Sequence, residues 1–282
     1  MSRTFFVYAV AGDAHIEQVN NSLRFLKKFS RQEIVIVAAR YQRTVEHDQV
    51  IRVEVPHHFN NHQASILLKT GLHRIVGVEG RTGCYLDSDV IAVHDGVQRI
   101  FQRKRGPITF AADHTRLSQF SRFAVRCSCV RGRCDHLREA IAAKFGVVVA
   151  DPEWQHWNGG VFLFDSESTD FMDAWHAYTS AIFDDPCWRT RDQGTLVAAA
   201  WRFGLQRQLT LAPKYNYIVD GMRGLPDQYR AQATPASYQV DETYSLDPSS
   251  PRLHPYFLHF INATGRRGWR NWDDAEARLE SA

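Results

Sequence analysis

Two carboxylates one residue apart are the clearest chemical signal in this sequence. Asp87 and Asp89 directly follow the apolar residues 84–86. A hard divalent cation takes oxygen ligands, and Mg²⁺ usually binds one or two carboxylates together with substrate phosphates. Side-chain alternation relaxes at the end of a strand, so both carboxylates could reach one ion. An Asp-rich turn without a ligand explains the same pattern.

Three later segments carry polar side chains where a ligand could bind. Asn158 stands before two glycines and a predicted strand, and glycines there let the backbone approach a ligand closely. Asp192 and Gln193 open a predicted helix, where Asp192 could equally be the N-cap. His259 lies in an otherwise apolar strand, where a histidine is either a ligand or a satisfied core residue.

The elements that must position these residues alternate between strand and helix over the first 110 residues. This alternation predicts an α/β fold with a mostly parallel sheet and helices on both faces. Ligands in such sheets bind at the carboxyl ends of the strands. Asp13, which follows the first strand, could therefore share one crevice with Asp87 and Asp89. The predicted strands are 5–10, 33–39, 50–55, 84–86 and 90–93, and the predicted helices are 16–29 and 64–76.

The second half of the chain has similar elements and two irregular stretches. Residues 114–138 are basic and rich in cysteine, and residues 223–252 form a loop-rich excursion without periodicity. No repeat or linker divides the chain, so we expect a single domain over residues 1–282. Strands are predicted at 108–112, 161–164 and 256–261, and helices at 137–145, 171–183, 193–203 and 273–280.

Composition excludes several classes of protein. Of the 282 residues, 44% are hydrophobic and 23% are charged, which is ordinary for a globular protein and excludes general disorder. The formal net charge of +3 does not by itself indicate nucleic-acid binding. No apolar run approaches the roughly 18–20 residues that span a bilayer. Five cysteines in a chain of this length predict a cytoplasmic protein with reduced thiols.

In their order along the chain, these residues resemble the nucleotide-sugar glycosyltransferases of the GT-A fold. The resemblance is strongest to the retaining family 8 group, which includes glycogenin and bacterial lipopolysaccharide galactosyltransferases. Gly268 departs from that pattern, because proline is usual there in the family's closing motif. The matching segments are Ala11-Gly12-Asp13, Lys69, Tyr85-Leu86-Asp87-Ser88-Asp89, Asn158-Gly159-Gly160-Val161, Asp192-Gln193, Pro213 with Tyr215 and Asn216, Leu258-His259-Phe260, and Gly265 with Arg266 and Trp269.

The resemblance implies a metal-dependent hexosyltransferase that uses a nucleotide-diphosphate sugar, with a UDP-sugar expected. Asp87, Asp89 and His259 would hold Mn²⁺ or Mg²⁺, and the metal would stabilise the diphosphate as the sugar leaves. Lys69 and Arg266 would neutralise the phosphates, or are solvated surface charges.

The resemblance also implies the side chains that contact the donor. Asn158, Asp192 and Gln193 would line the sugar pocket, with Gln193 near the anomeric carbon and retention of configuration. Asp13 would bind the base or ribose of the nucleotide, or it only forms a turn.

The basic stretch 114–138 has no counterpart in that family pattern. Cys127, Cys129, Cys134 and His136 follow the spacing C-x-C-x₄-C-x-H, and Cys₃His is a known zinc ligand set. The spacing is not a standard one, so free thiols and a local disulfide remain open. The surrounding arginines favour an anionic acceptor, or they are an exposed loop without a ligand.

Other functions compete with sugar transfer. A nucleic-acid-binding protein could use the Cys/His loop as a zinc module, but this leaves Asp87, Asp89, Asn158 and His259 unexplained. A glycosyltransferase whose acceptor is a nucleic acid or a nucleoside would combine sugar transfer with nucleic-acid recognition. An inactive sugar-nucleotide-binding protein of the same fold is a further alternative.

Overall fold

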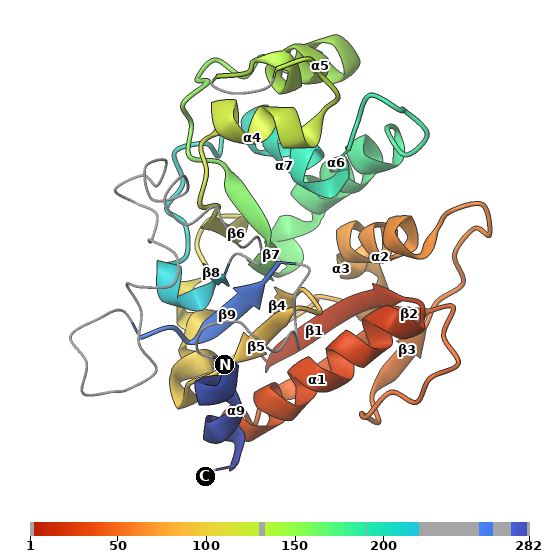
Figure 1. Cartoon of the computed structure of the whole chain (residues 1–282), viewed down its shortest axis with the longest axis vertical. Coiled ribbons are helices and arrows are strands. Elements are labelled where there is room, and N and C mark those ends of the chain that lie inside the picture. Colours follow the sequence, from red (N-terminus) through yellow and green to blue (C-terminus); the bar gives the residue numbers. More distant parts are fainter. Residues whose placement is uncertain (1–2, 130–132, 190, 220–253, 262–271, 281–282) are drawn as a thin grey trace.

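The computed structural model describes residues 3–129, 133–189, 191–219, 254–261 and 272–280. Its centre is a six-stranded sheet in the order β3-β2-β1-β4-β7-β6, and only β7 runs against its neighbours (Figure 1). The predicted mixed, mostly parallel sheet is therefore confirmed. The strands are β1 (Arg3–Ala11), β2 (Glu33–Ala39), β3 (Val50–Arg52), β4 (Arg81–Leu86), β6 (Ile108–Ala112) and β7 (Trp157–Phe164).

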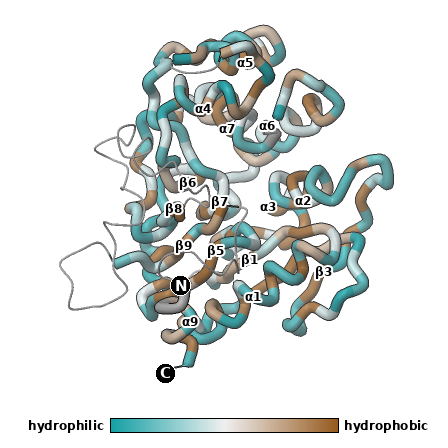
Figure 2. Tube along the Cα trace, in the orientation of Figure 1, coloured by the Kyte–Doolittle hydropathy of each residue, from teal (hydrophilic) through white to brown (hydrophobic). Residues whose placement is uncertain are grey.

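Helices cover both faces of this sheet, as the sequence predicted. Alternate residues of β1 point to opposite sides, so Tyr8 packs in the core beneath α1 (Asp13–Phe29) and Val7 in the core beneath α2 (Asn61–Thr70). Hydrophobic and hydrophilic residues alternate along α1, whose apolar stripe faces the sheet (Figure 2). The other helices are α3 (Leu72–Val76), α4 (Leu117–Ala124), α5 (His136–Phe145), α6 (Thr169–Ser180), α7 (Arg191–Arg202) and α9 (Trp272–Glu280), with 3₁₀ turns η1 (Asp95–Arg103), η2 (Ser166–Ser168) and η3 (Pro213–Tyr215).

A second, three-stranded sheet joins one segment from the first third of the chain to two segments from its last quarter. β9 (Phe257–Phe260) lies between β5 (Val90–Ala92) and β8 (Tyr217–Val219), antiparallel to β5 and parallel to β8. Among the described residues, no helix combines the length and the apolar character needed to cross a bilayer.

The structure departs from the sequence-based elements in several places. The strand predicted over 161–164 begins already at Trp157, so Asn158 and the two glycines after it lie inside β7 and not before it. The single helix predicted over 64–76 is two helices, because Gly71 closes α2 with a backbone bond to Leu67 before α3 begins. The strand predicted over 50–55 ends at Arg52. The helix α4 lies within the basic stretch, where none was predicted; its buried residues Leu117, Phe120 and Ala124 are the helical signal that was overlooked.

Candidate functional site

The site lies where several strands end at one edge of the central sheet. β4 and β6 point the same way and β7 runs between them in the opposite direction. The carboxyl ends of β4 and β6 therefore meet the beginning of β7. Asp87 follows β4, Asp113 follows β6, and Asn158 is the second residue of β7. Ligands in α/β sheets bind at such an edge.

The possible ligand atoms of Asp87, Asp89 and His259 converge at this edge and lie within 4.8 Å of one another. The Nε2 atom of His259 is 3.2 Å from Asp89 Oδ1 and 3.9 Å from Asp87 Oδ2. Pairing of β5 with β9 places Val90 opposite His259, so the imidazole stands beside the carboxylate that precedes β5. The structure thus brings together the three side chains that the sequence singled out as metal ligands.

A chain of hydrogen bonds fixes which nitrogen of His259 faces the two aspartates. The ionised Asp113 can only accept, so the amide that contacts it at 3.0 Å is the Nδ2 of Asn158. Asn158 Oδ1 then accepts from Asn216 Nδ2 at 3.0 Å, and Asn216 Oδ1 accepts from His259 Nδ1 at 3.0 Å. The proton on Nδ1 leaves Nε2 as the nitrogen that faces Asp87 and Asp89. Such a bond to the distal nitrogen is typical of metal-ligating histidines.

The ligand atoms of Asp87, Asp89 and His259 suit a hard or borderline divalent cation. Two carboxylates and one oriented imidazole are suitable ligands for Mn²⁺ and Mg²⁺. Burial lowers the pKa of His259, but the charges of Asp89 and Asp87 outweigh it and the net effect is a raised pKa. A positive charge is therefore stabilised at this position, which is the electrostatic requirement of a cation site.

A buried lysine links the two halves of the site. Lys69 Nζ lies 2.9 Å from Asp192 Oδ2 and 3.2 Å from Asp87 Oδ1, and only 4% of the residue is exposed. Burial opposes the charged form, but Asp192 and Asp87 raise the pKa of Lys69 overall. The hydroxyl of Tyr85 donates a further hydrogen bond of 2.5 Å to Asp87 Oδ1. Lys69 is thus an internal ion-pair partner and not a solvated surface charge.

The opposite wall is built around Asp113, which the sequence analysis did not select. Its Oδ2 accepts hydrogen bonds of 3.0 Å from both Asn158 and Gln193. Gln193 also donates to the Trp157 carbonyl at 3.0 Å, and its Oε1 accepts from the backbone of Gly159 at 3.2 Å. Burial alone would raise the pKa of Asp113, but nearby histidines and hydrogen bonds hold it well below its ordinary value.

These groups line one cavity of about 480 Å³, a size typical of small-molecule sites. His62, an exposed residue, is among the side chains that line it. The lining includes His15, Gln18, His62, Lys69, Tyr85, Asp87, Asp89, Asp113, His114, Thr115, Phe120, Phe123, Asn158, Gly160, Arg189, Asp192, Gln193 and His259.

Of the other predicted ligand residues, Asp13 is not among the residues that line this cavity. Asp13 is exposed at the start of α1, and its Oδ1 accepts 2.8 Å hydrogen bonds from the backbones of Gln42 and Arg43. These bonds lower the pKa of Asp13 and match the turn-forming alternative, so a contact with the nucleotide stays a prediction. Arg266 lies outside the described residues, as do the closing motif and the stretch 223–252.

Several arginines of the basic stretch already have acidic partners. Arg133 lies 3.3 Å from Glu153, Arg116 lies 3.8 Å from the same carboxylate, and Arg138 pairs with Asp135 at 2.7 Å. An anionic acceptor at this stretch stays a prediction.

Comparison with known proteins places this chain by structure and not by sequence. No protein-family model and no curated protein matches the sequence. Mouse xyloside xylosyltransferase 1 matches with a TM-score of 0.51 at 12% identity, over 94% of this chain and 99% of that one. The galactosyltransferase LgtC, solved with donor and acceptor sugar analogs, matches with a TM-score of 0.56 at 12% identity, over 99% and 95%.

A third similar structure is the bifunctional glycosyltransferase WbbM, with a TM-score of 0.59 at 11% identity. The match covers 100% of this chain and 50% of the WbbM structure. At such low identities, the likeness establishes the fold. The chain has the GT-A fold that the sequence predicted.

Proposed function

We propose that this protein is a metal-dependent glycosyltransferase that uses a nucleotide-diphosphate sugar, with a UDP-sugar as the first candidate. The observation that carries the proposal is the convergence of Asp87, Asp89 and His259 beside the Asp113–Gln193 wall in one cavity of a GT-A fold. A diphosphate needs a cation, and a sugar needs several fixed hydrogen-bonding groups. The cavity brings together side chains that could bind a cation and fixed groups that could bind a sugar.

The metal side of the site would bind the diphosphate of the donor. Asp87, Asp89 and His259 would hold Mn²⁺ or Mg²⁺, and the cation would stabilise negative charge on the departing nucleotide. His259 is already oriented for this by Asn216. Lys69 stands next to Asp87 and would add a second positive charge beside the leaving group.

The opposite wall would hold the sugar. Asp113, Asn158, Asp192 and Gln193 present carboxylate and amide groups whose positions are fixed by hydrogen bonds to one another or to Lys69. Fixed polar groups lose little conformational entropy when a sugar hydroxyl replaces one of their contacts. In this arrangement Gln193 would lie closest to the anomeric carbon.

The electrostatics of these carboxylates favour retention of configuration. An inverting transferase needs a carboxylate base, whereas a double displacement and an attack on the face of the leaving group both retain configuration. Burial would raise the pKa of Asp113 and of Asp192, but histidines beside Asp113 and Lys69 beside Asp192 lower both, which makes each a weak base. Attack by the acceptor hydroxyl on the face of the leaving group needs no such carboxylate base.

The decisive experiment is a thermal-shift titration of the full chain with UDP, UDP-glucose, UDP-galactose and GDP-mannose, each with and without Mn²⁺. Binding to the native state raises the stability by about 2.7 kcal/mol at a hundredfold excess over the dissociation constant. We expect one nucleotide sugar to raise the melting temperature only when Mn²⁺ is present. Slow hydrolysis of that donor, followed by NMR, then gives the anomer released, and retention predicts the donor's own anomer.

Matched variants separate the site from general effects. Asp89→Asn keeps the side-chain shape and removes a charge, so the Mn²⁺-dependent shift should vanish. Asp170→Asn changes an exposed acid at the start of α6 and should leave the shift intact. If folded wild-type protein shows no shift with any of these nucleotides, the proposed donor class is wrong.

A further inference from the structure

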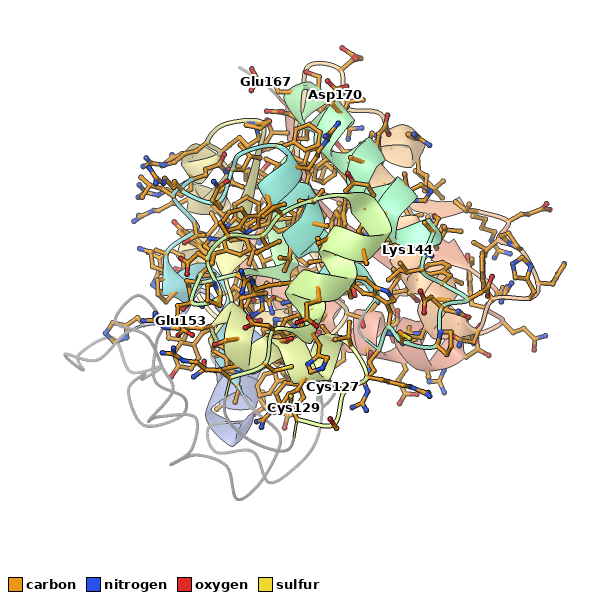
Figure 3. All side chains as sticks on the ribbon, turned by 90° about the horizontal axis from the view of Figure 1, so that it is seen from above. Cys127, Cys129, Lys144, Glu153, Glu167 and Asp170 are labelled. Atoms are coloured by element: carbon orange, nitrogen blue, oxygen red, sulfur yellow. The ribbon has the colours of Figure 1, made fainter. Side chains whose placement is uncertain are left out.

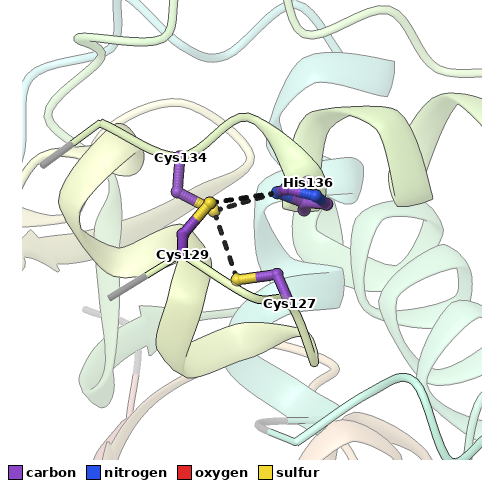
Figure 4. Close-up of side chains that lie close together, drawn as sticks. All are labelled: Cys127, Cys129, Cys134 and His136. Atoms are coloured by element: carbon purple, nitrogen blue, oxygen red, sulfur yellow. Dashed lines mark hydrogen bonds between the residues drawn. The ribbon is translucent and has the colours of Figure 1, made fainter. Parts of the chain in front are cut away.

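A second cluster of metal-ligand side chains lies apart from the donor cavity, between α4 and α5. Cys127 and Cys129 follow α4, Cys134 precedes α5, and His136 is the first residue of α5. Seen from above, Cys127 and Cys129 lie beside each other near the molecular surface (Figure 3). The close-up shows the three sulfur atoms and the imidazole pointing toward one another (Figure 4). None of these residues lines the donor cavity.

Three distances within the cluster are close to those of a tetrahedral metal site. Zinc lies about 2.3 Å from sulfur and about 2.0–2.1 Å from histidine nitrogen, so the edges of a tetrahedron around it measure about 3.5–3.8 Å. Cys127 Sγ and Cys134 Sγ are 3.6 Å apart, and His136 Nδ1 lies 3.7 Å from Cys129 Sγ and 3.3 Å from Cys134 Sγ. All four ligand atoms lie within 4.8 Å of one another.

Surrounding groups hold the innermost ligand in place. The hydroxyl of Ser121 donates to Cys134 Sγ at 3.2 Å, and the same hydroxyl accepts from the backbone of Leu137 at 2.9 Å. The backbone N–H of Cys134 donates to the Ser118 carbonyl at 3.1 Å. Hydrogen bonds of this kind to a thiolate orient the ligands of metal sites. Ser118 and Ser121 both belong to α4, so the ligand beside α5 is already oriented by α4.

We propose that Cys127, Cys129, Cys134 and His136 bind a structural zinc ion. Four protein ligands fill a tetrahedral site and leave no position for a substrate, which is the mark of structural zinc. Three thiolates and one imidazole around Zn²⁺ carry a net charge of −1, and in the sequence Arg126 directly precedes Cys127 and Arg133 directly precedes Cys134.

The zinc would fix a wall of the donor cavity. α4 contributes Phe120 and Phe123 to the cavity lining, and the cluster joins the end of α4 to α5. The segment after α4 also pairs with the segment that leads into α7. The backbone N–H of Arg189 donates to the Ala124 carbonyl, and the backbone N–H of Arg126 donates to the Cys187 carbonyl, each at 2.7 Å. The zinc would therefore hold the side of the cavity on which Asp192 and Gln193 begin α7.

The test is the zinc content of the full chain, purified under reducing conditions without added metal. We expect about one zinc per chain, bound tightly enough to survive dialysis. Replacing zinc with Co²⁺ should give thiolate-to-metal charge-transfer absorption and the strong visible bands of a tetrahedral site, a measurement that needs no variant. Zinc-free protein with reduced cysteines would overturn the proposal, and so would a disulfide between Cys127 and Cys134 in the purified chain.

Variants assign the ion to this cluster and not to the donor cavity. Cys134→Ser and His136→Ala should lose the zinc, whereas His136→Cys supplies a fourth thiolate and should keep it. Cys187→Ser removes an exposed cysteine outside the cluster and should keep the zinc, as should Asp89→Asn. Loss of zinc in Asp89→Asn alone would place the ion in the donor cavity and overturn the assignment. Zinc content does not depend on sugar transfer, so the two proposals can fail separately.

Discussion

At the scale of single residues, the cavity around Lys69 depends on charges that compensate one another inside the protein. Lys69 neutralises Asp87 and Asp192, which belong to different elements and would otherwise repel each other. Removing one partner of a buried ion pair typically costs about 3–5 kcal/mol, because the remaining charges are left without compensation. Lys69 therefore stabilises the fold and the site at the same time.

Lys69→Met tests this charge balance. We expect the variant to lose about 3 kcal/mol in the free energy of unfolding, measured by urea denaturation without metal. Mn²⁺ should restore more stability to the variant than it adds to the wild type, because the cation replaces the missing charge beside Asp87. Lys144→Met removes an exposed lysine whose acidic partner is 3.7 Å away and should change stability by less than about 0.5 kcal/mol. Equal losses in both variants would contradict this account.

At the scale of elements, the imidazole of His259 on β9 packs so closely against Gly160 of β7 that no side chain fits at this position. A Cβ atom placed on Gly160 would lie 2.2 Å from His259 Cε1 and 2.9 Å from Asn158 Oδ1. Real Cβ atoms do not approach other atoms this closely, so His259 would have to leave its position. The register between β6 and β7 also shifts next to this point, after Phe110. The irregular sheet and the glycine together make room for the imidazole.

Gly160→Ala should therefore abolish Mn²⁺-dependent donor binding by moving His259. Gly83→Ala is the matched control: its Cβ would meet Phe164 at 2.5 Å in the core of the same sheet, away from the cavity. Both variants should lose stability in a urea titration, but only Gly160→Ala should lose the Mn²⁺-dependent thermal shift. A normal shift in Gly160→Ala would show that His259 is not needed for the metal.

The sequence predicted those elements and site residues whose signals are local. Apolar runs gave the strands of the central sheet, and Asp87 and Asp89 form a visible pair directly after one of them. Asp113 was missed because it is a single acid after a strand, and its importance depends on Asn158 and Gln193, which join it only in the folded chain. The pairing of β9 with β5 and β8 is equally non-local. A short apolar segment does not specify its partners.

At the scale of the whole molecule, several buried histidines tie the stability of the fold to pH. His156 is fully buried, stacks on Phe120 and lies 3.6 Å from Asp113. Burial lowers the pKa of His156 and outweighs the attraction of Asp113. Since the folded pKa lies below the unfolded value of 6.5, the unfolded chain takes up the proton first. Stability should then fall as the pH decreases below about 6.5, by at most about 1.4 kcal/mol per pH unit for this proton.

His156→Gln should flatten the dependence of unfolding free energy on pH between 7 and 5, relative to the wild type. Burial also lowers the pKa values of His73 and His176, so part of the slope should persist in the variant. His57→Gln changes an exposed histidine and should leave the wild-type profile unchanged. Urea titrations at each pH measure the effect. A wild-type slope in His156→Gln would rule out His156 as a source of the pH dependence.

The position of β9 between β5 and β8 also determines when Asp87, Asp89 and His259 can come together during synthesis of the chain. Asp87 and Asp89 leave the ribosome long before His259 does. At about 5–20 residues per second, the two carboxylates wait roughly 10–30 seconds for their imidazole partner. A nascent chain can build the central sheet during that interval, but it cannot complete the cation site. Occupancy of the proposed site by a metal ion would therefore report that His259 has left the ribosome.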